Sequence, residues 1–333
     1  IEFHEPISLK ALMERNQLAL ETMDKEATSA FCRNIGHRVI HAINRITIIT
    51  PHALVAASIL NQPSEPCTYE DIVQVADIYL KHLNFHDYKL ADTLVMDPQH
   101  ALEQAFEAYT QRKFVEAVGS KGEDDESRVR YRTNPDKRPS LEYYKNNCVA
   151  CFVPAAFTAL AILETDAFQF VSTDLHLTYL SLQDLFKYEF AYDIEKSAAF
   201  YVRKSIKAFI DDAALMPHAT LPDTYQITSA GLRALQLYAR FVKSYLEAYL
   251  VALSQIGRQK SSDVGYKEHA KKAGALGSRM LKQGEITCPE ALSQVTFKNA
   301  LTFFNSRDIE SVEDSKAAQL YRDAIQRYLG LLR

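Results

Sequence analysis

The spacing of apolar residues constrains this chain most, because the spacing has the helical period over much of its length. Between residues 27 and 46, apolar side chains recur every three or four positions; they are Ala27, Phe31, Ile35, Val39, Ala42, Ile43 and Ile46. Recurrence at this period places the side chains on one face of an α-helix. The pattern therefore predicts a long amphipathic helix near the start of the chain.

Several further helices have recognisable starting signals. Thr50-Pro51 supplies a capping hydroxyl followed by proline at the first helical position. Thr68-x-x-Asp71 has the pattern of a capping box, and Asp97-Pro98 predicts another helix start. We expect the last helix to begin at Ser311-x-x-Asp314. The chain is therefore predicted to be mainly α, a multi-helical domain with a few short strands or hairpins.

The strands are predicted where the helical pattern is interrupted. Val129–Thr133 alternates apolar and polar residues and is expected to form a hairpin with Phe114–Val118. Met216–Thr228 contains two prolines and the strand-like sequence TYQIT. An amphipathic helix followed by a turn or strand recurs in three segments, which are 101–119, 202–218 and 295–311. This order suits winged-helix-like units in series, although their period is irregular.

The first residues predict a domain boundary. Ile1-Glu2-Phe3 alternates like a strand that ends before Pro6, and a lone strand cannot satisfy its backbone hydrogen bonds. We therefore expect its sheet to lie outside this chain, and the missing initiating methionine also indicates a fragment. The predicted units are an end strand and linker (1–16), a helical domain (17–254) and a C-terminal helical subdomain (255–333).

Composition excludes some classes of protein. Hydrophobic residues make up 47% and charged residues 24% of the 333 residues, as in a soluble globular protein. A net charge of −4 argues against a nucleic-acid binder with a basic surface. Five cysteines, an odd number, favour a reduced intracellular protein over a disulfide framework.

Two uncharged stretches, Ile46–Ser64 and Asn146–Leu163, raise the question of membrane insertion. Each contains a proline, and their strictly apolar parts are shorter than the roughly 20 residues of a membrane-spanning helix. We therefore expect both to be buried helices. Attachment to a membrane surface through a partner domain remains compatible with this composition.

Two histidine pairs have a spacing that can bind zinc. His37 with His41, and His82 with His86, are each four residues apart on one helix face. Neither pair has glutamate after its first histidine, as a zinc protease would, and neither has an evident third ligand. Satisfied or exposed histidines are the expected outcome, and we predict no metal site.

Other chemical motifs are incomplete. Cys148-Val-Ala-Cys151 lies inside an apolar helical run, which favours buried structural cysteines over a redox pair. The H-x4-D pattern of acyltransferases occurs as His82…Asp87 and His218…Asp223. The first spacing turns its side chains to different helix faces, and the second lacks apolar flanks for a water-poor pocket. We find no glycine-rich phosphate loop. We therefore expect no catalytic, cofactor-binding or metal-binding residues in this chain.

Several blocks nevertheless resemble a known family. EFHEPISL at the start of the chain is similar to the FGEPI stretch that closes the acyltransferase domain of glycerol-3-phosphate and dihydroxyacetone-phosphate acyltransferases. Gly36–Leu60 resembles the helical block that follows in those enzymes, and Tyr225–Leu253 resembles a later helix. Glu142–Leu163 contains YYKNN, which matches their YY(K/R)NN block and is the most specific of these matches.

The resemblance implies the C-terminal helical region of a glycerol-3-phosphate 1-O-acyltransferase. Such an enzyme moves a fatty acyl group from acyl-CoA or acyl-carrier protein to the sn-1 hydroxyl, the first step of phospholipid synthesis at the cytoplasmic face of the inner membrane. Its HxxxxD histidine and phosphate-binding blocks precede FGEPI, so none is carried onto a residue here. The expected role is auxiliary: this chain supports its own acyltransferase domain and is inactive alone, without cofactor or nucleic acid. YYKNN favours glycerol 3-phosphate over dihydroxyacetone phosphate as acceptor.

The sequence also departs from the family pattern and leaves alternatives open. His4 stands where the family usually has glycine, and both 119–138 and the tail after Arg307 lack a clear counterpart. One alternative is a stand-alone helical or winged-helix protein that binds a protein or nucleic acid, with Arg128–Arg132 as a small basic wing. A complete enzyme is a third alternative, supported by the two H-x4-D segments alone.

Overall fold

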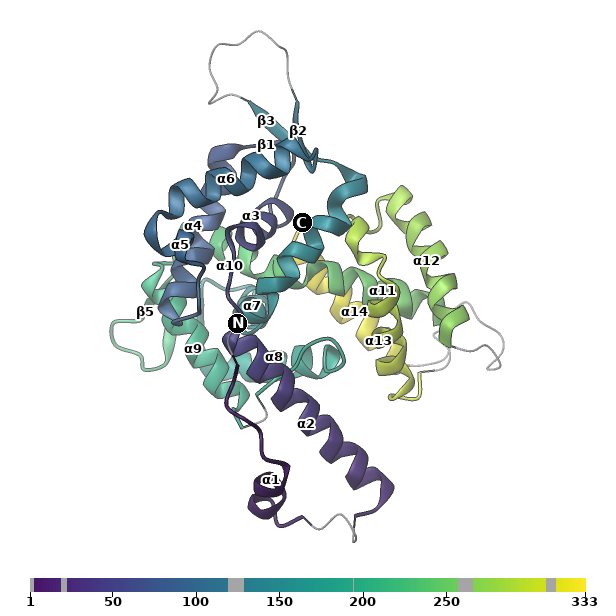
Figure 1. Cartoon of the computed structure of the whole chain (residues 1–333). Helices are drawn as coiled ribbons and strands as arrows, with labels where there is room; N and C mark the ends of the chain where they lie inside the picture. Colours follow the sequence, from purple (N-terminus) through teal and green to yellow (C-terminus); the bar gives the residue numbers. More distant parts are fainter. Residues whose placement is uncertain (1–2, 19–22, 119–128, 194, 257–265, 310–315) are drawn as a thin grey trace.

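The computed structural model describes residues 3–18, 23–118, 129–193, 195–256, 266–309 and 316–333. These residues form a multi-helical protein with two small antiparallel sheets (Figure 1). The long helix α7 (Arg138–Glu164) lies in the middle of the body. The predicted fold class, mainly α with a few short strands, is therefore confirmed.

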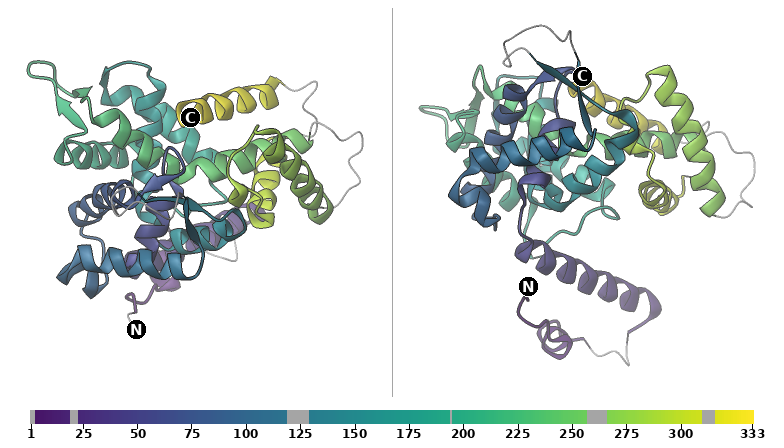
Figure 2. Two further views of the ribbon diagram at one scale, coloured as in Figure 1. Left: turned by 90° about the horizontal axis from the view of Figure 1, so that it is seen from above. Right: turned by 45° about the horizontal axis from the view of Figure 1, so that its top comes forward.

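The N-terminal arm, residues 3–46, contains α1 (Leu9–Arg15) and α2 (Lys25–Ile46). Asp24 caps α2 by accepting a hydrogen bond from the Ala27 amide. In Figure 1 and in the right view of Figure 2, α2 projects away from the body, with α1 beyond it. All of α2 is described, and Ala42 is its single buried residue. The predicted amphipathic helix is confirmed, but most of its apolar face lies outside the core.

The predicted N-terminal strand falls partly outside the described residues, because Ile1 and Glu2 are not among them. Residues 3–8 have no strand structure, and the Phe3 side chain is 88% exposed. A sheet partner for this segment outside the chain stays a prediction.

The first sheet belongs to a unit that runs from residue 51 to residue 133. Its elements are α3 (Pro51–Leu60), β1 (Cys67–Thr68), α4 (Tyr69–Phe85), α5 (Asp92–Met96), α6 (Pro98–Gln111), β2 (Val115–Val118) and β3 (Arg130–Thr133). The strands pair antiparallel in the order β1-β3-β2, with Val115 opposite Thr133 and Val118 opposite Arg130. The predicted hairpin is therefore confirmed.

A second unit repeats this element order. After α7 it contains β4 (Gln169–Val171), α8 (Leu175–Leu185), α9 (Ala198–Asp211), β5 (Leu215–Pro217) and β6 (Thr224–Ile227). Its strands pair antiparallel in the order β4-β6-β5, the arrangement of the first sheet. In both units a helix is followed by a strand, further helices, and a hairpin that returns to that strand. The structure thus contains two of the predicted winged-helix-like units.

The helices before the two hairpins, and the helix Gln294–Asn305, end with the same backbone turn. Lys113, Ala213 and Asp308 each adopt a left-handed conformation, with φ of 56°, 54° and 55°. The following amide then donates to the carbonyl five residues back, as in a Schellman cap. These bonds join Phe114 to Tyr109, Ala214 to Phe209, and Ile309 to Phe304. The third predicted segment thus has the helix and the turn, but no strand within residues 306–309.

The remaining elements complete the body around α7. They are α10 (Gly231–Ala239), α11 (Lys243–Ile256), α12 (Tyr266–Gln283), α13 (Gln294–Asn305), α14 (Lys316–Leu331), and the short 3-10 turns η3 (Pro135–Lys137), η4 (Ser172–Asp174), η5 (Arg240–Val242) and η6 (Pro289–Ala291). Buried side chains from Ile49 to Leu332 form one hydrophobic cluster. It includes residues on both sides of position 255, and the proposed division there stays a prediction.

The predicted helix starts are observed where the structure describes them. The Thr50 hydroxyl accepts from the Ala53 amide, with Pro51 at the first helical position of α3. Thr68 and Asp71 form a complete capping box at α4. The Asp97 carboxylate caps α6. The predicted cap of the last helix, Ser311–Asp314, lies outside the described residues.

The two apolar stretches are buried helices, as predicted. Eight residues of α3 are buried. The helical stretch Pro135–Glu164, which includes α7, is long and apolar enough to cross a membrane, and 78% of its most apolar window is buried in the protein. The prediction that its apolar part is too short was therefore wrong, while the prediction of burial is confirmed.

Candidate functional site

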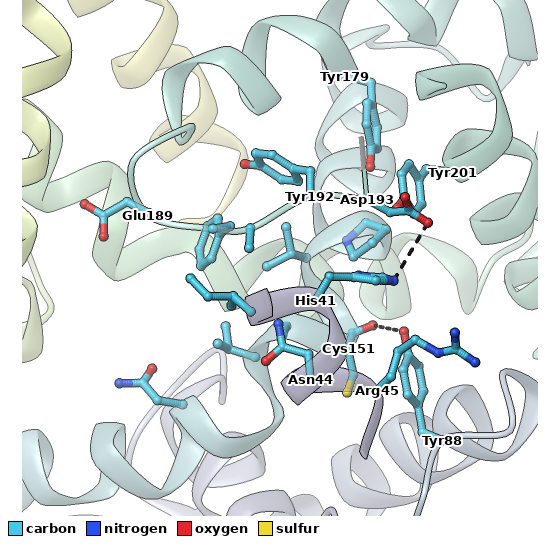
Figure 3. Close-up of a pocket in the computed structure, with 18 residues that line it drawn as sticks. His41, Asn44, Arg45, Tyr88, Cys151, Tyr179, Glu189, Tyr192, Asp193 and Tyr201 are labelled. Atoms are coloured by element: carbon cyan, nitrogen blue, oxygen red, sulfur yellow. Dashed lines mark hydrogen bonds and ion pairs between the residues drawn. The ribbon is translucent and has the colours of Figure 1, made fainter. Parts of the chain in front are cut away.

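A pocket of about 240 Å³ lies where the base of α2 meets the body (Figure 3). Its walls come from α2, from the middle of α7, from residues 189–193, and from α8 and α9. The α2 and α7 walls belong to two of the sequence blocks singled out above, Gly36–Leu60 and Glu142–Leu163. The pocket is thus the place where segments of both blocks meet.

The first histidine pair faces the segment that closes this pocket. The Tyr192 amide donates to His37 Nδ1 at 3.3 Å, and His41 Nε2 lies 3.8 Å from Asp193 Oδ2. Burial lowers the pKa of both imidazoles, although Asp193 opposes this effect at His41. Within the described part of the chain, no group of three or more His, Cys, Asp or Glu side chains is placed to hold a metal ion. The pair therefore joins α2 to the body.

Several phenol groups line the pocket (Figure 3). Tyr179 is fully buried, and its hydroxyl has no hydrogen-bond partner among the residues that the structure describes. Burial raises the pKa of Tyr201 to about 12. The Tyr88 hydroxyl donates to the Cys151 carbonyl at 3.4 Å. Because these phenols stay protonated at neutral pH, they act as hydrogen-bond donors rather than bases.

Glu189 lies on the opposite side of the pocket from the His41–Asp193 pair (Figure 3). Burial raises its pKa to about 7, although the hydrogen bond from Asn299 opposes the shift. The Asn299 amide donates to Glu189 Oε2 at 3.1 Å. This carboxyl group therefore titrates near neutral pH. Sequence reasoning missed Glu189 and Asp193, because neither lies in a motif.

His82, the first H-x4-D histidine, lies in the core rather than in a reaction pocket. Its side chain is 3% exposed, and its Nε2 lies 3.3 Å from the Cys151 carbonyl. Burial, with the adjacent His86 imidazole as the second cause, lowers the pKa of His82 to about 3. A general base works best with a pKa near the working pH. His82 is therefore poorly suited to that role.

His218, the second H-x4-D histidine, belongs to the turn between β5 and β6. Its Nδ1 accepts backbone hydrogen bonds from Thr220 at 3.2 Å and from Leu221 at 3.1 Å. Asp223, further along the same turn, has a left-handed backbone with φ of 51°. The nitrogen that a general base would use to accept a proton, Nδ1, thus already accepts hydrogen bonds that stabilise the hairpin turn.

The two cysteines of the CxxC motif are free and buried inside α7. Burial raises the pKa of Cys151 to about 12, and it raises the pKa of Cys148 further. Redox-active cysteines have a lowered pKa, because the thiolate is the reactive form. The environment of these thiols therefore gives them a packing role.

The YYKNN block lies on the first half of α7, with one residue at the pocket and another buried in the interior. Lys145 is 2% exposed, and its Nζ lies 2.8 Å from the Glu142 carboxylate. Asn146 lines the pocket and accepts a hydrogen bond from the Tyr245 hydroxyl at 3.2 Å. Tyr143, by contrast, is 77% exposed. The block thus combines a buried ion pair with one pocket residue.

A family model for the glycerol-3-phosphate acyltransferase C-terminal region matches residues 1–313. The chain belongs to this family. The match includes the start of the chain and the segment after Arg307, and it ends before α14.

Known proteins similar to this glycerol-3-phosphate acyltransferase C-terminal region are longer. The glycerol-3-phosphate acyltransferase of Actinobacillus pleuropneumoniae serotype 3 (strain JL03) is 23% identical over 294 residues, which cover 86% of this chain and 34% of that protein. A Mycobacterium tuberculosis protein (strain ATCC 25618 / H37Rv), named as the acyltransferase plsB1, is 23% identical over 337 residues, which cover 98% of this chain and 52% of that protein. The chain thus spans about a third to about half of these relatives.

Among the described residues, neither H-x4-D histidine is placed as a base, and the pocket at α2 has no nucleophile activated by its neighbours. The structural feature that stands out is the C-terminal half of α2, where the N-terminal arm contacts the body.

Proposed function

We propose that this chain is the helical C-terminal part of a glycerol-3-phosphate 1-O-acyltransferase, and that it packs on and stabilises the acyltransferase part of the enzyme. The main support is the N-terminal arm. Val39, Ile40 and Ile43 of α2 are 41%, 49% and 53% exposed, and they lie together on a helix that projects from the body. Contiguous exposed apolar residues mark interaction sites in soluble proteins.

The free energy gained by burying these three side chains against a partner is modest, but it is sufficient for contact within one polypeptide. Burying the exposed halves of three large aliphatic side chains contributes roughly 3 kcal/mol. A free complex would lose most of this to the entropy of association. A covalently linked domain has a high effective concentration and avoids most of that loss. The arm is therefore suited to contact between parts of one enzyme.

The chemistry in this proposal belongs to the acyltransferase part. That part would transfer an acyl group from acyl-CoA or acyl-carrier protein to glycerol 3-phosphate, at the cytoplasmic face of the inner membrane. The support is the family membership, together with the printed names of the longer relatives. The role of the present chain is then to hold that part in its folded arrangement.

The test begins with the gene that contains this chain. We expect it to encode an HxxxxD-bearing domain upstream of Ile1, and we expect the full-length protein, but not the 333-residue chain, to acylate glycerol 3-phosphate. In the full-length protein, Ile43→Asp should lower the midpoint of thermal inactivation. The matched control is Leu320→Asp on α14, where the leucine is 70% exposed. Turnover by the chain alone would contradict the proposal.

A nucleic-acid-binding protein is the second candidate, because the two units have a winged-helix-like order. The helices before the two hairpins differ in charge, with Arg203 and Lys207 exposed on α9 and Glu103 and Glu107 exposed on α6. Only α9 thus has the charge that phosphate requires. Fluorescence anisotropy with a labelled duplex is expected to show no binding. Tight, salt-sensitive binding that Lys207→Ala weakens would favour this candidate instead.

A further inference from the structure

The outward face of α2 has the spacing of a helix–helix contact. Its residues alternate at intervals of three and four, the pattern of the a and d positions of a coiled coil. We name this face the α2 seam; its residues are Ser29, Cys32, Gly36, Val39, Ile43 and Ile46. Ser29, Cys32, Val39 and Ile43 are exposed, while Gly36 and Ile46 are partly exposed. The body of this chain therefore leaves the seam largely uncovered.

Gly36 lies in the middle of the seam, where a side chain would meet no clash with the described part of this chain. Among the described residues, no atom lies within 4 Å of a Cβ added at this position, and the backbone of the residue is helical. Glycine in the middle of an exposed helix is destabilising relative to alanine. Its missing side chain becomes useful when another backbone approaches closely, because the distance between packed helices depends on the residues at their contact.

The charged side chains around the seam are positive. From Ala27 to Ile46, α2 contains three arginines and no carboxylate, in a chain with a net charge of −4. Glu195 of the body pairs with Arg38 at 2.9 Å. Arg33 is exposed and lies beside the seam. A partner that carries a carboxylate next to an apolar stripe would complement this face.

We infer that the α2 seam binds one α-helix of the acyltransferase part of the longer enzyme, with its closest approach at Gly36 and a carboxylate near Arg33. This inference rests on the proposed function, and it specifies the contact. The occupant is sought in the same enzyme because similar proteins extend well beyond the aligned region, which is 34% of one relative and 52% of another. A helix fits better than a lipid surface, because the seam is narrow and half of it consists of small residues.

Cys32, one of the seam residues, allows the contact to be tested by chemical labelling. All five cysteines are described, and Cys32 is the exposed one. In the 333-residue chain, maleimide should label Cys32 rapidly. In the full-length enzyme, a helix on the seam should slow labelling of Cys32 at least tenfold, as measured by mass spectrometry of the peptide that contains it. Equal rates in the two proteins would overturn the inference, whereas the acylation assay tests the proposed function separately.

Substitutions at Gly36 test the close approach. In the full-length enzyme, Gly36→Leu should restore rapid labelling of Cys32, and Gly36→Ala should increase it severalfold. In the 333-residue chain, Gly36→Ala should leave the melting temperature unchanged or raise it, because the added methyl group meets no neighbour in the part of the chain that the structure describes. Gly330 on α14 is the matched control, since it is also helical and open. Continued protection of Cys32 in Gly36→Leu would refute a helix packed at this position.

Discussion

Acidification should destabilise this protein through His82, which is buried as a neutral imidazole. Its ring is stacked on Phe152 with centroids 5.1 Å apart, and Tyr238 lies 5.3 Å away. The pKa of His82 is lowered to about 3, whereas an unfolded histidine has a pKa near 6.5. The unfolded chain therefore binds more protons at this residue between about pH 3 and pH 6.5. Stability from this residue is complete above that window and falls as the pH falls through it.

The expected magnitude follows from the two pKa values. A pH of 5 is about 1.5 units below the pKa of the histidine in the unfolded chain, so that imidazole is protonated. In the folded protein the imidazole is still neutral at this pH. Each unit corresponds to about 1.4 kcal/mol, so acidification from pH 8 to pH 5 costs about 2 kcal/mol at this residue. Replacement by glutamine removes the titration, and any loss of packing affects both pH values alike.

Urea unfolding at pH 8 and pH 5 measures this difference. The wild-type chain should lose about 2 kcal/mol more between the two pH values than His82→Gln loses. Other titrating groups are present in both proteins and cancel in the comparison. His100→Gln is the control, because His100 is exposed on α6. Equal losses in the wild type and His82→Gln would refute a buried neutral imidazole, and they would reopen the question of His82 as a base.

Two further predictions concern buried carboxyl groups. Glu247 is 2% exposed and accepts hydrogen bonds from the backbone amides of Thr287 and Cys288 at 3.0 and 2.7 Å, so Glu247→Ala should lower the free energy of unfolding by about 3 kcal/mol in urea. A loss below about 1 kcal/mol would contradict that role, and Glu247→Gln should lose less. Glu189 has its pKa raised to about 7, so the folded protein binds the extra proton between about pH 4.5 and pH 7, and stability falls as the pH rises through this window. Glu189→Gln should remove this decline, and an unchanged pH profile in urea unfolding would show that the carboxyl group is solvated.

Local chemistry made the helix starts and hairpins predictable. The side chains of Thr50, Thr68 and Asp97 satisfy backbone amides within three residues along the chain, so the signal and its effect lie in one short segment. Alternation likewise identified both strands of the pairing between β2 and β3. The second unit could be anticipated for the same reason, because each helix, turn and hairpin is specified by adjacent residues.

The pocket at the base of α2 could not be predicted in this way. His37 was noted for its spacing from His41, but its partner Tyr192 is 155 residues away. Asp193 and Glu189 belong to no motif, and burial by distant segments produces the raised pKa of Glu189. Sequence spacing identifies which side chains share a helix face. It does not identify the segment that this face will contact.

The same limit explains why α2 resembled a core helix. Periodicity shows that a helix has an apolar face, and the face looks alike whether this chain or another body covers it. The difference lies in what borders the face. Helix α3 has no polar side and is buried all round, whereas α2 has arginines beside a stripe that contains an open glycine. A core helix gains nothing from Gly36, because no neighbour within the described ranges comes near it. A helix that receives a partner at close range does gain from it, and this favours a contact outside the chain as the reason for the amphipathic pattern.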